Sequence, residues 1–154
     1  MKLKIGILII SIFYVVYLSI VGYSNSCVTR ALAVEGEGSF YKALGYLDTS
    51  EKLDPLNSNI PYTKFAFFND KFNKAKGLTY REKVELLDEG LLELKKAINL
   101  RPTEASYHMF YGLALLKRHP LRKGSVYEQA KSELRRARAL KPASKKYKSI
   151  SEKY

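Results

Sequence analysis

The chain carries one long apolar stretch, residues 5–23 (IGILIISIFYVVYLSIVGY), in which no side chain is charged. At ~1.5 Å of rise per residue, a helix of this length spans roughly 28 Å, which is close to the ~30 Å hydrocarbon core of a bilayer. Helices that pack inside soluble proteins seldom contain such a run. The pattern therefore predicts a transmembrane helix that contacts the lipid bilayer through these residues.

The charges that flank this stretch predict its orientation. Lys2 and Lys4 precede it, whereas the fifteen residues that follow it carry one arginine against two glutamates. Positive residues are enriched on the cytoplasmic side of membrane proteins. We therefore expect residues 1–23 to form a cytoplasmic N-terminus and an anchor in a bacterial-type inner membrane. The rest of the chain would then be periplasmic or otherwise extracytoplasmic.

A cleaved signal peptide is the alternative interpretation, because a basic segment precedes the apolar run and small residues follow it. Ser24-Asn25-Ser26 and Ala31-Leu32-Ala33 place small residues at alternate positions, so cleavage would remove residues 1–26 or 1–33. The run is longer than the ~7–15 apolar residues of a typical signal peptide. This difference favours a retained anchor.

A second pattern recurs three times, each time before a proline. The first copy has Ala43, Leu47 and Ser50 ahead of Pro55. The same offsets return twice, in Gly90, Leu94, Ala97, Pro102 and in Ala130, Leu134, Ala137, Pro142. Small residues let two helices approach closely, a large apolar residue fills the gap between them, and proline ends the helix. The three segments resemble the second helix of the tetratricopeptide repeat (TPR).

The segments ahead of these copies are the expected first helices of the repeats. Residues 105–117 match best, because Tyr111-Gly112 occurs where the TPR pattern has a large apolar residue and glycine, and apolar residues recur at helical spacing. Residues 60–72 match the first-helix pattern of the TPR only in their apolar character. Residues 24–35 would form the first helix of the first repeat, with Ala31 as its small packing residue and a glycine turn after it.

The copies are 47 and 40 residues apart, longer than the ~34-residue TPR period, so each later repeat contains an insertion. We place these insertions at residues 69–77 and 119–124. Capping boxes follow both, at Thr79 with Glu82 and at Ser125 with Glu128, and predict fresh helix starts.

Together these patterns predict an all-α protein. An N-terminal transmembrane helix is followed by about three TPR helix-turn-helix pairs, which form a short right-handed solenoid. The expected TPR domain is 24–141, with repeats at 24–57, 58–104 and 105–141. Residues 142–154 form a basic C-terminal tail or a capping segment.

The residues that usually carry catalysis or hold metal are scarce. Cys27 is the single cysteine, which excludes an intrachain disulfide and a Cys-based zinc site. We expect it to be a buried or interfacial thiol, with lipidation or an intermolecular disulfide as alternatives. His108, on a helix face, and His119, in a loop, have no acidic partner at ligand spacing. No nucleotide- or metal-binding motif is present. We predict that the protein is not an enzyme and has no catalytic, metal or cofactor site.

The resemblance to TPR proteins implies binding in a groove lined by the first helices. Residues 105–117 carry a second apolar row outside their packing stripe, which suits a partner on that side. The expected protein-binding groove comprises Tyr62, Asn69, Ser106, Met109, Leu113 and Leu116. The alternative is that these side chains pack on neighbouring helices.

The net charge of +12 is concentrated at one end of the chain. Residues 24–116 carry 12 basic and 12 acidic side chains, whereas residues 117–154 carry 13 basic and 3 acidic ones. The expected basic patch comprises Lys131, Arg135, Arg136, Arg138, Lys145, Lys146 and Lys148. It is a solvated cap, or it attracts an acidic protein, glycan or lipid headgroup. We do not expect nucleic acid, because the patch is predicted outside the cytoplasm and no recognition motif accompanies it.

These features favour a non-enzymatic, membrane-anchored TPR scaffold that mediates protein–protein interaction or complex assembly with membrane or envelope components. Residues 43–57 are also similar to periplasmic repeats attached to O-antigen ligase-type membrane proteins, which points to cell-envelope biogenesis. The alternatives are a structural accessory subunit of a larger membrane complex and, if the N-terminal segment is cleaved, a secreted TPR protein.

Overall fold

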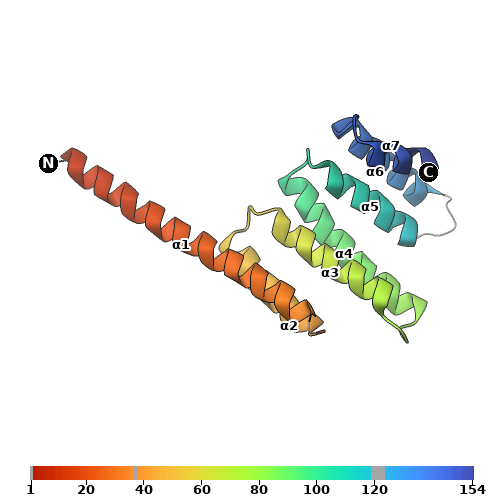
Figure 1. Ribbon diagram of the computed structural model, residues 1–154, viewed down its shortest axis with the longest axis horizontal. Helices are drawn as coiled ribbons and strands as arrows, with labels where there is room; N and C mark the ends of the chain where they lie inside the picture. Colours follow the sequence, from red (N-terminus) through yellow and green to blue (C-terminus); the bar gives the residue numbers. More distant parts are fainter. Residues whose placement is uncertain (1, 37, 119–123) are drawn as a thin grey trace. The chain divides into compact units, whose positions relative to one another are not determined.

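The computed structural model describes residues 2–36, 38–118 and 124–154, which are helical throughout except for short turns (Figure 1). The all-α prediction is confirmed: this part of the chain contains seven helices and no strand. It divides into two compact units, one ending at Ile60 and the other beginning at Pro61. The helices are α1 (Lys2–Gly36), α2 (Phe40–Leu53), α3 (Asn59–Lys74), α4 (Tyr80–Leu100), α5 (Ala105–Arg118), α6 (Ser125–Leu140) and α7 (Lys145–Lys153).

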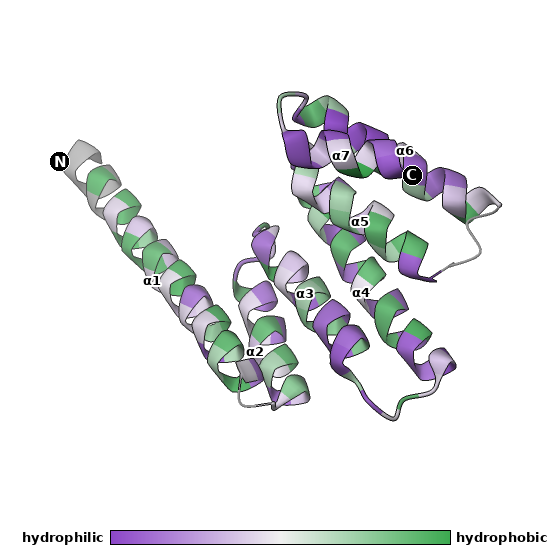
Figure 2. Cartoon of the chain, turned by 45° about the vertical axis from the view of Figure 1, so that its right-hand side comes forward, coloured by the Kyte–Doolittle hydropathy of each residue, from purple (hydrophilic) through white to green (hydrophobic). Residues whose placement is uncertain are grey.

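Helix α1 joins the apolar stretch and the first helix of the first repeat without a break. Its 35 residues correspond to roughly 50 Å of helix. Apolar side chains at Ile7 and from Ile9 to Ile20 are exposed on every side, whereas contacts with α2 begin in the region of Val21 and Ser24 (Figure 2). Residues 9–36 are long and apolar enough to cross a membrane by length and composition. The expected boundary at residues 23 and 24 thus lies inside one continuous helix.

The pair α1 and α2 is held by small side chains in mirrored spacing. Ser24, Cys27 and Ala31 are buried on α1. Ser50, Leu47 and Ala43 are buried on α2 at the same intervals in reverse order, as an antiparallel pair requires. The Ser24 and Ser50 hydroxyl oxygens lie 2.7 Å apart.

Each serine hydroxyl of this pair also lies within hydrogen-bonding distance of the other residue's carbonyl oxygen, at 3.3 and 3.0 Å. The two buried serines therefore satisfy one another's polar groups. Cys27 has only 2% of its surface exposed, which agrees with the expected buried thiol.

The three proline-terminated segments form α2, α4 and α6, and they end in the same conformation. The residue that caps the C-terminal end is Asp54 on α2, Arg101 on α4 and Lys141 on α6. Their φ angles are −136°, −143° and −136°, and their ψ angles are 72°, 74° and 68°. The backbone N–H of each donates to the carbonyl four residues earlier, at 2.9, 3.0 and 3.2 Å. A residue that precedes proline is disfavoured in the helical region, which explains why all three helices end there. The nine packing positions predicted ahead of the prolines are all buried.

The second unit has two apolar clusters that share α5. One joins α3, α4 and α5 around Phe65, Leu87, Leu94 and Tyr111. The other joins α5, α6 and α7 around Met109, Leu134 and Tyr147. Helix α7 thus packs on the last helix pair and buries Tyr147, while its other residues are largely hydrophilic (Figure 2).

Of the two predicted capping boxes, one is present and the other is wrong. The Thr79 hydroxyl accepts from the Glu82 backbone N–H at 3.3 Å, and the Thr79 backbone N–H donates to the Glu82 carboxylate at 2.7 Å. Helix α6 instead begins at Ser125, and the capping position falls on Gly124, whose φ of 86° suits glycine. The Gly124 carbonyl accepts from the backbone of Glu128 at 3.2 Å.

His108 is fully buried and ties α5 to α6. Its Nδ1 lies 2.6 Å from the Glu133 carboxylate, and its Nε2 lies 2.9 Å from the Pro102 carbonyl oxygen. Each of these two oxygens can accept a hydrogen bond from a ring N–H of His108. His108 is therefore a structural residue of the third repeat. The predicted loop residue His119 lies outside the described residues.

The space around two helical glycines predicts opposite effects when each is replaced by alanine. A Cβ added at Gly112 would meet the Ala130 carbonyl oxygen at 2.8 Å and the Leu134 Cγ at 2.9 Å, whereas one at Gly45 meets nothing within 4 Å. Gly112→Ala should lower the free energy of unfolding by about 1–3 kcal/mol through overpacking. Gly45→Ala should raise it by about 0.5–1 kcal/mol, because alanine favours a helix interior.

Urea unfolding in mild detergent, followed by circular dichroism, measures both changes. A Gly112→Ala variant as stable as the unmodified protein would contradict the close approach of α5 and α6.

Candidate functional site

Aromatic side chains connect α3 and α5, the first helices of the second and third pairs. The Tyr62 ring stacks on Tyr107 with centroids 5.1 Å apart and lies 5.8 Å from the Phe110 ring. Phe65 lies 6.3 Å from the same phenylalanine. Burial, and then the neighbouring Tyr107, raises the pKa of Tyr62 above its ordinary value. Aromatic pairs of this geometry contribute binding surface as well as stability.

Lys117, near the end of α5, reaches across to α3. Its ammonium donates to the Asn69 Oδ1 at 2.8 Å and to the Asn73 Oδ1 at 3.2 Å. The same Nζ lies 5.8 Å from the centre of the Phe72 ring. Although the side chain as a whole is exposed, this placement withdraws the ammonium from water, and desolvation lowers the pKa of Lys117. Among the described residues, its hydrogen-bond partners are neutral amides.

A second lysine approaches the same side from α7. The Lys146 Nζ lies 5.8 Å from the centre of the Phe110 ring, a cation–π distance. We define the α3–α5–α7 face by the residues that these contacts link: Tyr62, Asn69, Asn73, Phe110, Lys117 and Lys146. The face combines aromatic rings, amide groups and two ammonium groups.

One carboxylate stands at the rim of this face. Glu104 accepts from the Ser106 hydroxyl at 2.8 Å and lies 3.7 Å from the Lys141 ammonium. The hydrogen bond from Ser106 is the main cause that lowers the pKa of Glu104. The carboxylate is thus engaged with its own neighbours.

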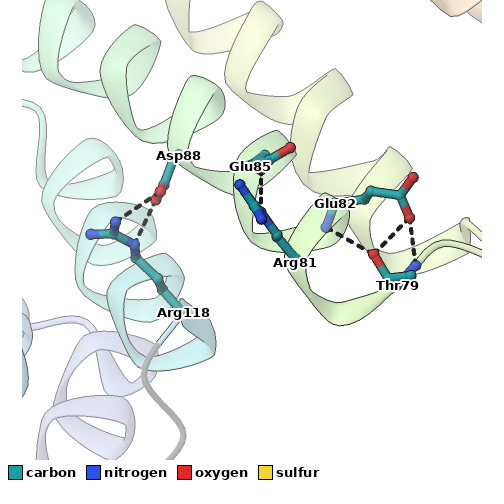
Figure 3. A network of polar contacts seen from close by, with 6 residues as sticks. All are labelled: Thr79, Arg81, Glu82, Glu85, Asp88 and Arg118. Carbon is teal, nitrogen blue, oxygen red and sulfur yellow. Dashed lines mark hydrogen bonds and ion pairs between the residues drawn. The ribbon is translucent and has the colours of Figure 1, made fainter.

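The end of α5 is held in place by α4. The Arg118 guanidinium binds both carboxylate oxygens of Asp88, at 2.8 and 2.6 Å (Figure 3). The Tyr80 hydroxyl donates to the Arg118 carbonyl oxygen at 3.0 Å. Tyr80 is the first residue of α4, directly after the capping residue Thr79, and Arg81 pairs with Glu85 on the same helix (Figure 3). These contacts fix the last turn of α5, which positions Lys117 against α3.

The structure places the predicted groove residues in different surroundings. Tyr62 and Asn69 belong to the α3–α5–α7 face, and Ser106 binds Glu104 at its rim. Leu113 and Leu116 are half-buried and pack on the apolar clusters. Met109 is only 1% exposed, because Leu134, Ala137 and Tyr147 cover it, so it is a core residue and not a groove contact.

The predicted basic residues make different contacts on α5, α6 and α7. Lys146 lies over Phe110 on α5. Arg138 instead approaches Ser151 and Glu152 on α7, at 3.4 and 3.8 Å. Lys131 and Arg135 line a pocket of about 200 Å³ with Ser151 and Tyr154. Arg136, Lys145 and Lys148 are exposed.

Sequence reasoning missed four members of the face. Asn73, Phe110 and Lys146 were assigned no role in the groove, and Lys117 was counted only in the charge balance. The recurrence of asparagine at Asn69 and Asn73, one helical turn apart, was the available signal. Among the described residues, no group of three or more His, Cys, Asp or Glu side chains is arranged to hold a metal ion.

Comparison with known proteins gives a match in structure alone. No family model matches the sequence, and no curated protein matches it. The TPR domain of Arabidopsis OM64 superposes with a TM-score of 0.63 at 16% identity, covering 87% of this chain and 95% of that one.

Two further solved structures are complexes. The first TPR domain of Spaghetti (RPAP3), bound to the HSP90 peptide SRMEEVD, gives a TM-score of 0.63 at 14% identity, covering 86% of this chain and 90% of that one. The second TPR domain of human RPAP3, in complex with the HSP70 peptide SGPTIEEVD, gives 0.61 at 15% identity, covering 89% and 96%. The chain therefore has a TPR-like fold.

The desolvation of the Lys117 ammonium predicts how stability changes when this charge is removed. A depressed lysine pKa means that the unfolded chain holds the proton more tightly, so the charge costs stability at neutral pH. Lys117→Met should therefore keep or raise the melting temperature. Its advantage over the unmodified protein should shrink as the pH approaches 10.5, the ordinary pKa of lysine.

Thermal unfolding over a pH series measures this effect, with Lys76→Met as the control at an exposed lysine. A large fall in melting temperature for Lys117→Met alone would instead mark Lys117 as a structural tie between α3 and α5.

Proposed function

We propose that this protein is a membrane-anchored scaffold that binds acidic segments of partner proteins through its α3–α5–α7 face. Helix α1 holds the repeats at the outer side of a bacterial-type inner membrane. The partners are other membrane or envelope proteins. The binding activity is non-enzymatic.

The observation that carries the proposal is the environment of Lys117. Two amide oxygens and a ring face orient its ammonium but leave its positive charge without a carboxylate among the described residues. An ammonium has three donors, and the two asparagines use two of them. An incoming carboxylate would take the third and neutralise the charge. The protein retains a partly desolvated charge that costs stability, which favours a binding role.

The aromatic rings supply the second half of the recognition. Tyr62 and Phe110 contact each other and offer apolar surface, and Lys146 adds a second cation over the Phe110 ring. A ligand that matches this face carries both acidic and apolar groups. The HSP90 and HSP70 peptides bound by the two RPAP3 domains, SRMEEVD and SGPTIEEVD, have this character. The likeness to those domains is one of fold, so it supports the class of ligand and not its identity.

The pairing of α1 with α2 supports a retained anchor. Cleavage after residue 26 would remove Ser24, whose hydroxyl bonds Ser50 in the buried interface. Cleavage after residue 33 would also remove Cys27 and Ala31, which are buried. Either cut would expose apolar surface of α2 and leave the Ser50 hydroxyl without its partner. A retained α1 keeps its exposed apolar half available for lipid.

Binding can be measured by fluorescence polarisation of labelled SRMEEVD with the full chain in mild detergent. Lys117→Met should weaken binding at least about tenfold, since a hydrogen bond to a charged group contributes about 1.5–3 kcal/mol. A peptide with amides in place of its carboxylates, SRMQQVN, should not bind. Arg136→Met, which removes an exposed charge from α6, should bind normally. Weaker binding by Arg136→Met with no change for Lys117→Met would move the site to the basic residues of α6.

The orientation and retention of α1 can be tested in bacterial cells. Alkaline phosphatase fused after Tyr154 should be active, because it folds only outside the cytoplasm, and a fusion that ends at Lys4 should be inactive. The intact mass of the membrane-extracted protein should include residues 1–33. Activity of a cytoplasmic reporter at Tyr154 would reverse the orientation, and a mass lacking the first 26 or 33 residues would show that the segment is a signal peptide.

A further inference from the structure

We propose that the turn between α2 and α3, residues 54–58, lies in the interfacial layer of the bilayer beside α1 and makes a second contact with lipid through Leu56. The inference rests on the proposed role of α1 as a membrane anchor. It concerns the first compact unit, which contains α1, α2 and this turn.

The register of α1 against α2 sets the height of the turn. Ser24 lies opposite Ser50, and the buried positions on the two helices run in opposite directions at matched intervals. Continuing by three residues places Leu53, at the end of α2, level with Val21 on α1. Both side chains are half-buried. The turn that follows α2 therefore lies beside the last turn of the apolar stretch, and not beside the polar part of α1.

The turn is suited to this position because its polar groups bond one another. The Asn57 backbone N–H donates to the Asp54 carbonyl oxygen at 3.2 Å, and the Asn57 side-chain amide donates to the Asp54 carboxylate at 3.1 Å. The Asn59 backbone N–H donates to the Asn57 side-chain oxygen at 3.1 Å. Satisfied polar groups lower the cost of leaving bulk water.

Leu56 projects from this turn with 80% of its surface exposed. A leucine at the tip of a tight, internally bonded turn leaves apolar surface in water unless another surface covers it. Along the axis of α1, the apolar half of the helix ends at the level of Leu56. This half is the part of the chain that the proposed function assigns to lipid. Lipid therefore accounts for both exposed surfaces at once.

Aromatic residues on α1 mark the same level. Tyr17 and Tyr23 are exposed at 61% and 53%, and they bracket Val21. Tyrosine is enriched where a membrane meets water, because its ring is apolar and its hydroxyl is polar. Residues 5–23 span roughly 28 Å, so this level falls at the outer boundary of a ~30 Å hydrocarbon core. The turn thus lies at a depth that Tyr17 and Tyr23 bracket on α1.

The chain offers a clean experiment, since it contains no tryptophan. Three full-length variants each introduce one: Leu56→Trp in the turn, Tyr41→Trp as the matched control, and Phe13→Trp within the apolar stretch. Tyr41 is also 80% exposed but lies at the opposite end of α2, about 18 Å from Leu53 along the helix. Each variant is reconstituted in phosphatidylcholine vesicles whose acyl chains carry bromine at a shallow or a deep position, and tryptophan quenching is measured.

We expect shallow bromines to quench Leu56→Trp, deep bromines to quench Phe13→Trp, and neither to quench Tyr41→Trp. Because Leu56 and Tyr41 receive the same residue, the affinity of tryptophan for the interface cannot by itself cause a difference between them. Quenching of Phe13→Trp with none at Leu56→Trp would overturn the inference and leave the anchor intact. Absence of quenching at all three positions would overturn the anchor, and the inference with it. Equal quenching of Leu56→Trp and Tyr41→Trp would contradict the proposed depth of the turn.

Discussion

The fold depends on the close approach of the two helices within each repeat, and that approach depends on small residues. Each second helix presents a small residue, a leucine and a second small residue at the same intervals, and all nine positions are buried. Gly112 has the least room of the described glycines, because a Cβ there would meet the backbone of α6. Such contacts gain dispersion energy only at short range, so a single added methyl group must displace a neighbouring helix. Proline then ends each second helix at the point where this packing is complete.

This constraint explains where the candidate binding groups lie. Small residues face the partner helix of the pair, which leaves the larger aromatic residues of α3 and α5 to meet each other. The last turn of α5 is fixed from α4 by the paired contacts of Arg118 with Asp88, while Lys117 points toward α3. A lysine that directly precedes a fixed arginine has fewer conformations to lose on binding an anion. Holding its ammonium partly out of water lowers the stability of the fold. The packing of the repeats offsets this loss.

The local features of the fold could be predicted from the sequence, whereas contacts between distant residues could not. The helix ends at Pro55, Pro102 and Pro142 follow from neighbouring residues, and the capping box at Thr79 needs only a glutamate three positions later. The second capping box failed because Gly124, with its positive φ, took the capping position ahead of Ser125.

Longer-range contacts explain the remaining differences. Lys117 meets asparagines 44 and 48 residues away, and His108 meets Glu133 across 25 residues. Met109 also belonged to an apolar row that suited a groove, yet α7 and α6 cover it. Periodicity shows that a helix has two apolar sides, but not which of them is covered by another part of the same chain.

The continuity of α1 links the membrane proposal to the repeat fold. A flexible segment after a membrane helix would let the first repeat move freely. The depth of the helix in the bilayer would then not determine the position of the repeat. Here the same helix that exposes apolar residues at Ile10 and Phe13 buries Cys27 and Ala31 against α2. Bending it near Ser24 would break helical hydrogen bonds and the Ser24–Ser50 contact together. If lipid fixes the depth of the apolar half, as proposed, the height of α2 and of its terminal turn follows from the register of the pair. In that arrangement the first repeat would act as a rigid extension of the proposed anchor.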